Sequence, residues 1–334
     1  MCRTGSGSDR VLRLASVGNP VAAAPGSDKM PPINLEWPLA RMIFDVIIIG
    51  AGLAGLQCAK ILSRSDAKVL LVDRKLDLTQ GIHTTGIFVR KTLEDFDFPA
   101  GTLGKPVRNV MLYSPKLKAL RLESEKDEFR VGKMGKLYES ILLECVENGV
   151  EFAKGTRYIS AKITSGAQAS RLHGRGFAPS ALRSRAISAA RGFFALHAHA
   201  SATRALQSKS VIVRLERNGE AFEVATKVLI GADGANSRVA KDLKLDENKE
   251  WIIGYEEVFH NVPLNGEPEL HCFLDAEIAP GYLAWITNDG DEVHIGVGGY
   301  PVKFDPRKAI KKFRDEIVPK FVDLKSCPPP QLVA

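Results

Sequence analysis

Three glycines and one acidic residue have the types and the spacing that recognition of a dinucleotide requires. Gly50, Gly52 and Gly55 fit a G-x-G-x-x-G pattern, in which the glycines allow a tight turn, close approach of a pyrophosphate and close packing of the next helix. Asp73 follows about 20 residues later, where a ribose hydroxyl needs an acceptor. The pattern predicts that backbone N–H groups at a helix N-terminus bind the phosphates.

A second glycine-rich stretch, Gly231–Arg238, follows an apolar run and carries its own acidic residue. Its glycines permit close approach of the backbone to a ligand, and Asp233 can accept hydrogen bonds from ribose or ribityl hydroxyl groups. Ser237 is expected to cap the helix that follows, over residues 238–243. A turn that is capped for folding alone is the alternative interpretation of this stretch.

The elements that must position these motifs follow from the apolar patterns. Residues 44–49, 69–72 and 227–230 are short runs rich in branched apolar residues, which are typical of buried parallel strands. Helices are expected over residues 56–62 and 133–146, where apolar residues recur at helical spacing. Strands and helices in this order predict an α/β fold with a parallel sheet.

An Asn-Gly pair at positions 218 and 219 separates two strand-like segments and predicts a β-hairpin. The strand expected before this hairpin ends at Ile163, although strands of a meander normally join through a few residues. Residues 165–210 are therefore expected to form an insert. The insert contains seven basic residues and no acidic one, which equals the chain's whole net charge of +7.

This charge distribution limits what the basic character of the chain can mean. Outside the insert, basic and acidic residues are equal in number. The net charge therefore does not indicate a basic binding face on the folded protein. The insert is expected to be disordered, because it is rich in Ala, Ser and Arg and lacks a periodic apolar pattern. A basic arm that contacts nucleic acid or anionic lipid is the alternative, but few aromatic residues interleave with the charges, and no nucleic-acid partner is expected.

The overall composition bounds the class of protein. A chain of 334 residues with 45% hydrophobic content can build one large or two ordinary domains. No apolar run approaches the ~20 residues that cross a bilayer, and the five scattered cysteines indicate a reducing compartment, with neither a disulfide framework nor a metal site. Residues 1–41 are expected to be a disordered or non-native tail. A cytoplasmic location is expected, with organellar targeting by this tail left open.

Taken together, the stretches DVIIIGAGLAG, VDRK and GADGANSRVA resemble the FAD-dependent oxidoreductases of the para-hydroxybenzoate hydroxylase type. Within that group the chain is most similar to the geranylgeranyl reductase family, because Ala279–Trp285 resembles the PGGYxW element of the family's substrate-domain sheet. The resemblance covers residues 42–305 apart from the insert. It implies FAD rather than NAD as the cofactor, since the second motif belongs to flavoproteins.

The resemblance also implies a division into domains. A Rossmann-like FAD-binding domain with a parallel sheet and a β-meander is expected over residues 42–100 and 127–250. A substrate domain with an antiparallel sheet is expected over residues 101–126 and 251–305. Residues 306–334 are expected to be a truncated C-terminal helix and tail.

The site residues that the resemblance implies fall into three groups. FAD contacts are implied for Gly50, Ala51, Gly52, Leu53, Ala54, Gly55, Asp73, Arg74, Thr84, Thr85, Gly86, Gly231, Asp233 and Gly234. Substrate contacts are implied for Tyr282 and Trp285, with the aromatic core of a curved sheet as the alternative. His83, beside the loop that passes the flavin ring, is the candidate catalytic residue, although a lone histidine more often has a structural hydrogen-bonding role.

Two features depart from the family pattern. A cysteine that the family often has near the flavin loop is replaced by the run His83-Thr84-Thr85. The third flavin motif, GDAAG, does not occur, and the only Gly-Asp dipeptide, Gly290-Asp291, is expected in a hairpin turn. The segment that walls part of the flavin in the family is therefore not recognisable in this sequence.

Three functions are compatible with these observations. The first is an FAD-dependent reductase of carbon–carbon double bonds in a small isoprenoid or lipid-like substrate, with peripheral membrane contact through that substrate. Its electron donor is NADPH or another carrier, which would visit the flavin transiently because the sequence has no second G-x-G-x-x-G. The second is an aromatic monooxygenase that uses FAD and NAD(P)H. The third is a truncated, catalytically incompetent flavoprotein fragment.

Overall fold

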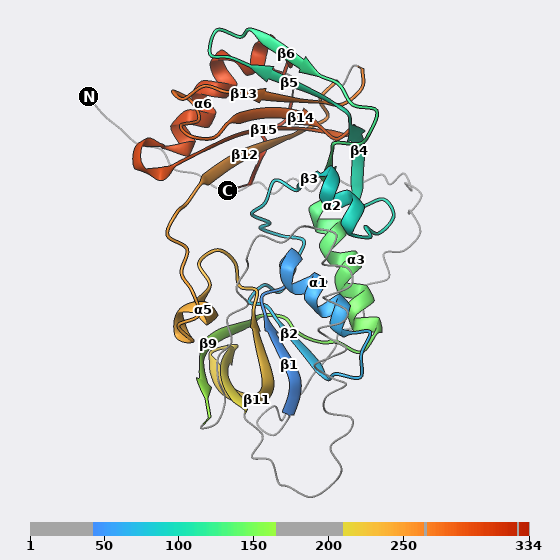
Figure 1. Cartoon of the computed structure of the whole chain (residues 1–334), viewed down its shortest axis with the longest axis vertical. Coiled ribbons are helices and arrows are strands. Elements are labelled where there is room, and N and C mark those ends of the chain that lie inside the picture. Colours follow the sequence, from blue (N-terminus) through green and yellow to red (C-terminus); the bar gives the residue numbers. More distant parts are fainter. Residues whose placement is uncertain (1–42, 165–209, 264–265, 326, 334) are drawn as a thin grey trace, which may run out of the picture. The chain divides into compact units, whose positions relative to one another are not determined.

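Branched apolar residues form the centre of a six-stranded sheet (Figure 1). β1 (Ile43–Ile49) and β2 (Val69–Val72) pair in parallel, and all four residues of β2 are buried, as expected for a strand covered on both faces. β8 (Glu151–Ala153) pairs with β2 and β11 (Glu220–Gly231) pairs with β1, both in parallel. With β10 (Val211–Arg217) and β9 (Thr156–Ile163), the strand order is β8-β2-β1-β11-β10-β9.

The computed structural model describes residues 43–164, 210–263, 266–325 and 327–333. All of them belong to one compact unit that spans residues 38–334. The expected N-terminal tail lies outside the described residues, and so does the expected insert apart from its last residue, Ser210.

The other half of the six-stranded sheet is the predicted meander. β9 (Thr156–Ile163) pairs in antiparallel fashion with β10 (Val211–Arg217), which continues into β11 through Asn218 and Gly219. The two turn residues have positive φ values of 52° and 83°, as a two-residue Asn-Gly hairpin requires. The last residue of β9 pairs with the first residue of β10, so the two ends of the long intervening segment lie side by side.

Two helices cover the parallel strands. α1 (Leu53–Leu62) packs on β1 and β2, and α3 (Met134–Glu147) packs on α1. The buried apolar side chains of α3 face the sheet at helical spacing, as predicted. The helix ends at Asn148, and Gly149 has a φ of 87°, the left-handed conformation that commonly ends a helix.

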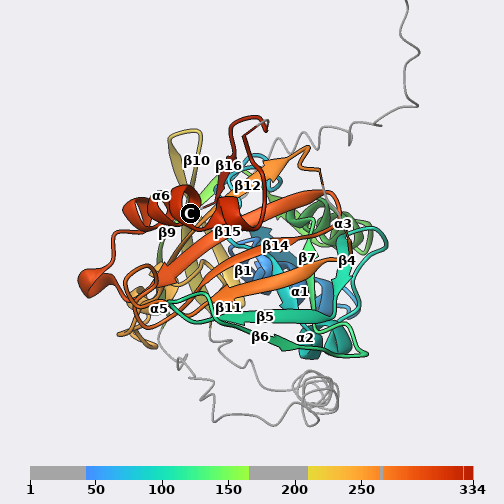
Figure 2. The ribbon, with the colours of Figure 1, turned by 90° about the horizontal axis from the view of Figure 1, so that it is seen from above.

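Seven strands form a second sheet in the order β16-β12-β15-β14-β13-β5-β6 (Figure 2). In that order they comprise Gln331–Val333, Ile253–His260, Glu292–Gly299, Ala284–Asn288, Glu269–Phe273, Asn109–Tyr113 and Ala119–Leu122. Neighbouring strands are antiparallel except β13 and β5. α6 (Pro306–Glu316) packs on β12 and β15 and buries Ile310 and Phe313.

Smaller elements complete the described part of the chain. A three-stranded antiparallel sheet has the order β3-β7-β4, formed by Ile87–Val89, Phe129–Gly132 and Leu103–Val107. The short helices are α2 (Arg90–Asp95) and α5 (Arg238–Asp242), with the 3₁₀ helices η3 (Pro301–Lys303) and η4 (Val318–Lys320).

The predicted fold class, α/β with a parallel sheet, a meander and a second, mainly antiparallel sheet, is confirmed. The predicted domain boundaries stay predictions, and the strand pairing differs from them in two places. β4, assigned to the substrate domain, pairs with β7 of the FAD-binding domain. α6 and β16, expected to be a separate helix and tail, belong with the seven-stranded sheet, because the apolar face of α6 needs a partner to bury it.

Candidate functional site

The turn between β1 and α1 is held by close contacts at two of its three glycines. Gly50 has a φ of 102°, its N–H donates to the carbonyl of Val72 at 2.8 Å, and a Cβ atom there would overlap the carbonyl of Ala232. A Cβ atom at Gly55 would overlap the carbonyl of Gly50. The first and third glycines of the motif are therefore required by the packing of the turn itself.

The second glycine differs from its neighbours, because the protein leaves the space beside it open. A Cβ atom at Gly52 would meet no atom within 4 Å. Gly52 is the N-cap of α1, has ordinary backbone angles, and precedes a first helical turn without acidic residues. An open space at a helix N-terminus suits an anionic group, which the helix dipole and the N–H groups of that turn attract.

Asp73 connects the end of β2 to this turn. One carboxylate oxygen, Oδ2, accepts a hydrogen bond from the backbone N–H of Ala51 at 2.7 Å, and Oδ1 accepts one from the N–H of Lys75 at 2.8 Å. The next residue, Arg74, is exposed. The acid predicted to bind a ribose thus also fixes the glycine turn.

The second motif lies against the first. The N–H of Ala232 donates to the carbonyl of Ile49 at 2.7 Å, which brings the stretch beside the β1–α1 turn. Asp233 accepts from the Ser237 hydroxyl and the Arg238 N–H, both at 2.6 Å, and from the N–H of the following residue at 3.2 Å. Ser237 Oγ accepts from the N–H of residue 240 at 3.0 Å, as the sequence predicted.

These bonds give Asp233 a capping role at the N-terminus of α5, which the sequence did not predict. The two glycines near Asp233 differ in the space available for a side chain. A Cβ atom at Gly231 would crowd the side chain of Val239, whereas one at Gly234, with a φ of 90°, would meet nothing within 4 Å. The contact of Asp233 with a flavin hydroxyl stays a prediction.

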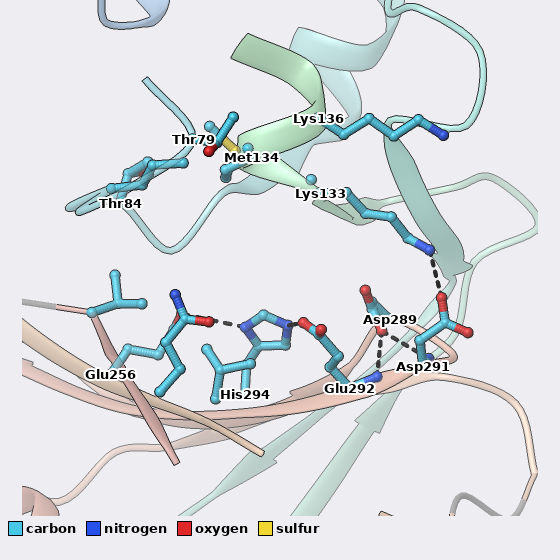
Figure 3. A pocket seen from close by; sticks show the side chains of 16 residues that line it. Thr79, Thr84, Lys133, Met134, Lys136, Glu256, Asp289, Asp291, Glu292 and His294 are labelled. Carbon is cyan, nitrogen blue, oxygen red and sulfur yellow. Dashed lines mark hydrogen bonds and ion pairs between the residues drawn. The ribbon is translucent and has the colours of Figure 1, made fainter. Parts of the chain in front are cut away.

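A cavity of about 300 Å³ adjoins the loop between β2 and β3 (Figure 3). The loop contributes Thr79, Ile82 and Thr84, and the end of β7 with the start of α3 contributes Gly132, Lys133, Met134, Gly135 and Lys136. The seven-stranded sheet contributes Glu256, Val258, Asp289, Asp291, Glu292, His294, Gln331 and Val333. The cavity thus combines residues from three distant parts of the sequence.

Only one of the loop residues predicted to pass the flavin ring lines this cavity. Thr84 lines it, whereas Thr85, Gly86 and the exposed His83 do not. Gly86 is buried with a φ of 67°, and its carbonyl accepts from the N–H of Gly132 at 2.9 Å. The loop is therefore tied to the residues just before α3.

The floor of the cavity contains a buried polar network that the sequence analysis missed. Glu256 is 1% exposed, and its Oε1 lies 3.3 Å from Nδ1 of His294, which is 6% exposed. Its Oε2 accepts from Nε1 of Trp285 at 3.0 Å. Burial lowers the pKa of His294, but the hydrogen bond to Glu256 and the neighbouring carboxylates outweigh it, so the pKa lies above its ordinary value.

Gly296 of β15 has no side chain, and this makes the network possible. Gly296 of β15 lies opposite both Glu256 of β12 and Trp285 of β14. A Cβ atom at Gly296 would overlap the indole ring, which therefore lies over the glycine and reaches the carboxylate on the far side. The sequence analysis did not single out Gly296, because one glycine within a strand is a weak signal.

Two further carboxylates, those of Asp289 and Glu292, stand next to His294, and Asp291 lies in the same turn between β14 and β15. Asp289 is 3% exposed, and its Oδ1 accepts from the N–H groups of Asp291 and Glu292 at 2.8 and 2.7 Å. Lys133 forms an ion pair of 2.5 Å with Asp291, and this hydrogen bond raises the pKa of Lys133. The predicted Gly290-Asp291 hairpin turn is confirmed, with a φ of 95° at the glycine.

Neither aromatic residue predicted to contact substrate lines the cavity. Trp285 is 6% exposed and packs with Val107, Leu270 and Cys272, which is the core role given as the alternative. Tyr282 is 49% exposed, and its ring lies over the strand glycine Gly298.

Comparison with known proteins gives a consistent result. The profile of the family described as pyridine nucleotide-disulphide oxidoreductase matches residues 44–250. The chain is 23% identical over 284 residues to digeranylgeranylglycerophospholipid reductase of Methanocaldococcus jannaschii, covering 82% of this chain and 59% of the relative. It is 24% identical over 262 residues to geranylgeranyl diphosphate reductase of Synechocystis sp., covering 77% and 55%. The chain thus spans little more than half the length of these curated relatives.

A solved structure extends the comparison to the fold. The geranylgeranyl bacteriochlorophyll reductase-like protein of Thermoplasma acidophilum superposes with a TM-score of 0.65 at 16% identity, over 87% of this chain and 65% of that chain. The predicted resemblance to the geranylgeranyl reductase family is confirmed. In the part of the chain that the structure describes, no helix is both long and apolar enough to cross a membrane.

Proposed function

Because the chain belongs to the pyridine nucleotide-disulphide oxidoreductase family, we propose that it binds FAD and is an oxidoreductase. Its substrate is an isoprenoid or another lipid-like molecule, whose carbon–carbon double bonds it reduces. Two curated relatives are named as reductases of geranylgeranyl compounds, which supports this substrate class.

The glycine turn fits the pyrophosphate of FAD. Gly50 and Gly55 are fixed by contacts inside the protein, while the open space beside Gly52 is a cradle that a single Cβ atom would enter. The backbone of Ala51, Leu53 and Ala54 completes this cradle. The remaining contacts follow the predicted assignment: Asp73 and Arg74 at the adenosine end, Thr84, Thr85 and Gly86 along the ring, and Gly231, Asp233 and Gly234 near the ribityl chain.

The observation that carries the proposed reaction is the cavity beside the Thr84 loop. Ile82, Met134, Val258 and Val333 give it apolar surface that an alkyl chain can contact, next to polar groups on the sheet. Bound FAD supplies hydride transfer. A proton from water completes the addition of two hydrogen atoms to the double bond, because the candidate His83 does not line this cavity.

NADPH is the electron donor in this proposal, since the family is one of pyridine nucleotide enzymes. The sequence has no second G-x-G-x-x-G for a resident nicotinamide dinucleotide, so the donor visits the site transiently. Peripheral contact with a membrane follows from a lipid-like substrate.

The first test measures the cofactor. The purified chain is desalted, its visible absorbance is recorded, and the released cofactor is identified by chromatography and compared with the protein concentration. One FAD per chain supports the proposal. A colourless protein that also takes up no added FAD would support the incompetent fragment instead.

The second test measures the reaction, with the flavin reduced anaerobically by dithionite so that the result does not depend on the donor. Geranylgeranyl diphosphate and a digeranylgeranyl glycerophospholipid are supplied in separate reactions, and products are examined by mass spectrometry. Addition of hydrogen at the double bonds supports a reductase. In a parallel aerobic reaction with NADPH and a phenol, a hydroxylated product without hydrogenation would favour the monooxygenase.

A further inference from the structure

One buried nitrogen in the cavity floor has no hydrogen-bond partner. Within the described residues, Nε2 of His294 accepts or donates no hydrogen bond, although the side chain is only 6% exposed. The other ring nitrogen faces Glu256, and because an ionised carboxylate only accepts, Nδ1 carries the hydrogen. In the neutral imidazole, Nε2 is therefore left with a lone pair, which is the form that binds a metal ion.

Two carboxylates surround this nitrogen. Oε2 of Glu292 lies 3.9 Å from Nε2 of His294, and Figure 3 shows the imidazole between Glu256 and Glu292. One donor atom each from Asp289, Glu292 and His294 can be chosen so that all lie within 4.8 Å of one another. A zinc ion with bonds of ~2 Å to these three atoms would draw them closer together than they lie here.

We propose that Asp289, Glu292 and His294 form a binding site for a divalent transition-metal ion, with Zn²⁺ as the best match. An imidazole nitrogen combined with carboxylate oxygens favours such ions over Mg²⁺ and Ca²⁺, which prefer oxygen alone. The site goes beyond the proposed function, because it requires neither flavin nor substrate.

The groups behind the three ligands support this assignment. His294 is oriented by Glu256, and Oε1 of Glu292 lies 2.8 Å from Nδ1 of His260. Oδ1 of Asp289 is held by two backbone N–H groups, which leaves Oδ2 for the metal. A histidine ligand whose second nitrogen donates to a carboxylate, and carboxylate ligands that are themselves held, are the usual outer partners of a metal site.

Burial and charge distinguish this site from an ordinary acidic surface patch. Asp289 and His294 are almost fully buried, so the carboxylates attract a cation through a medium with little water. Lys133 is paired with Asp291 rather than with either carboxylate ligand. All three ligands line the cavity, so the remaining coordination positions face it, and an oxygen atom of a molecule held there can complete them.

Zinc binding tests the inference on the untagged full-length chain, stripped with EDTA and desalted. Zn²⁺ is titrated in competition with a chromophoric chelator, and bound zinc is counted by mass spectrometry after equilibrium dialysis. Glu292→Gln keeps the shape of a half-buried side chain but removes a ligand. We expect it to lower the affinity for Zn²⁺ by more than about 100-fold, which exceeds the cost of losing an outer partner. Glu256→Gln should lower it by about 10–100-fold, the usual cost of losing an outer partner.

The matched control is Glu269→Gln on the same sheet. Glu269 Oε2 lies 3.9 Å from Nε2 of His271, the same separation as in the proposed site, but the described residues offer no third ligand there. This variant should bind zinc as the unmodified chain does. Histidines outside the described residues can also bind zinc. The measured quantity is therefore the difference in zinc bound per chain between the unmodified chain and Glu292→Gln, which we expect to be one ion. Circular dichroism establishes that each variant is folded.

Equal zinc content and affinity in the unmodified chain and in folded Glu292→Gln would overturn the inference. So would equal competition by Mg²⁺, which would indicate general attraction to carboxylates. Because the measurement uses protein without flavin or substrate, its failure leaves the proposed oxidoreductase untouched, and a failed turnover assay leaves the metal site untouched.

Discussion

The carboxylate of Asp73 and the backbone N–H of Ala51, 22 residues apart in the sequence, are joined by a hydrogen bond of 2.7 Å. The bond ties the end of β2 to the glycine turn after β1 without any ligand. The turn is therefore organised by the protein itself, and of its three glycines only Gly52 keeps space free.

Gly52→Ala is expected to reduce FAD binding while leaving the fold intact. The added methyl group enters space that no protein atom occupies, and the backbone angles of Gly52 suit alanine, so loss of the N-cap glycine should cost less than about 1 kcal/mol. FAD content after desalting and the free energy of unfolding in urea are the measurements. Gly55→Ala is the contrast, because its Cβ atom overlaps the carbonyl of Gly50 and should impair folding as well. Undiminished FAD in Gly52→Ala would contradict this placement of the pyrophosphate.

Asp233→Ala is expected to destabilise the protein in the absence of flavin. Asp233 accepts three hydrogen bonds at the start of α5, and their loss should lower the free energy of unfolding by about 2 kcal/mol. Asp233→Asn keeps an acceptor and should lose less. Urea unfolding of the flavin-free protein separates the two roles of this residue, since an acid that served only the cofactor would leave the stability of that form unchanged.

Local spacing explains which parts of the molecule could be predicted from the sequence. The glycine turn and the Asn218-Gly219 hairpin each depend on a few neighbouring residues with a required φ value, so the sequence alone predicted them. The predicted cap at Ser237 is confirmed for the same reason. The sequence did not predict that Asp233 also caps α5, because an acidic residue that accepts from the first N–H groups of a helix has the same sequence pattern as one that binds a cofactor.

The cavity floor could not be predicted, because strand pairing creates it. Glu256 and His294 are 38 residues apart and meet only in the register that places β12 beside β15. A one-residue change in that register would move the carboxylate to the other face of the sheet. Glu257, the neighbouring residue in the sequence, illustrates this, since it pairs instead with Arg314 of α6.

Gly296→Ala is expected to disrupt the buried network, because its Cβ atom would overlap the indole of Trp285 and separate it from Glu256. We expect the free energy of unfolding to fall by about 1–3 kcal/mol, as for other overpacked cores, with a change in tryptophan fluorescence. Gly254→Ala on the neighbouring strand is the control, since its Cβ atom would lie 3.9 Å from the nearest atom and should be tolerated. Equal stability of the two variants would show that the indole can move without cost.

The thiols of Cys145 in α3 and Cys272 in β13 are buried, so their reactivity measures how tightly the protein packs around each of them. Burial, the largest cause, raises the pKa of Cys145 and that of Cys272 to about 11 each. Because the thiolate is the reactive form, at pH 8 both should react with Ellman's reagent more than about 100-fold more slowly than an exposed cysteine. In guanidinium chloride, all five cysteines of the chain should react.

The pH dependence of labelling identifies the cause of this protection. If the thiols react while buried, raising the pH from 8 to 9 should increase the rate about tenfold, because the thiolate fraction rises tenfold per unit below the pKa. If they react only when the protein opens, denaturant should increase the rate instead, and Cys145 should then report on separation of α1 from α3, since its thiol lies 3.7 Å from the carbonyl of Leu56. Cys145→Ser identifies the signal of that residue. Rapid labelling of Cys145 at pH 8 without denaturant would contradict the packing of α3 on α1.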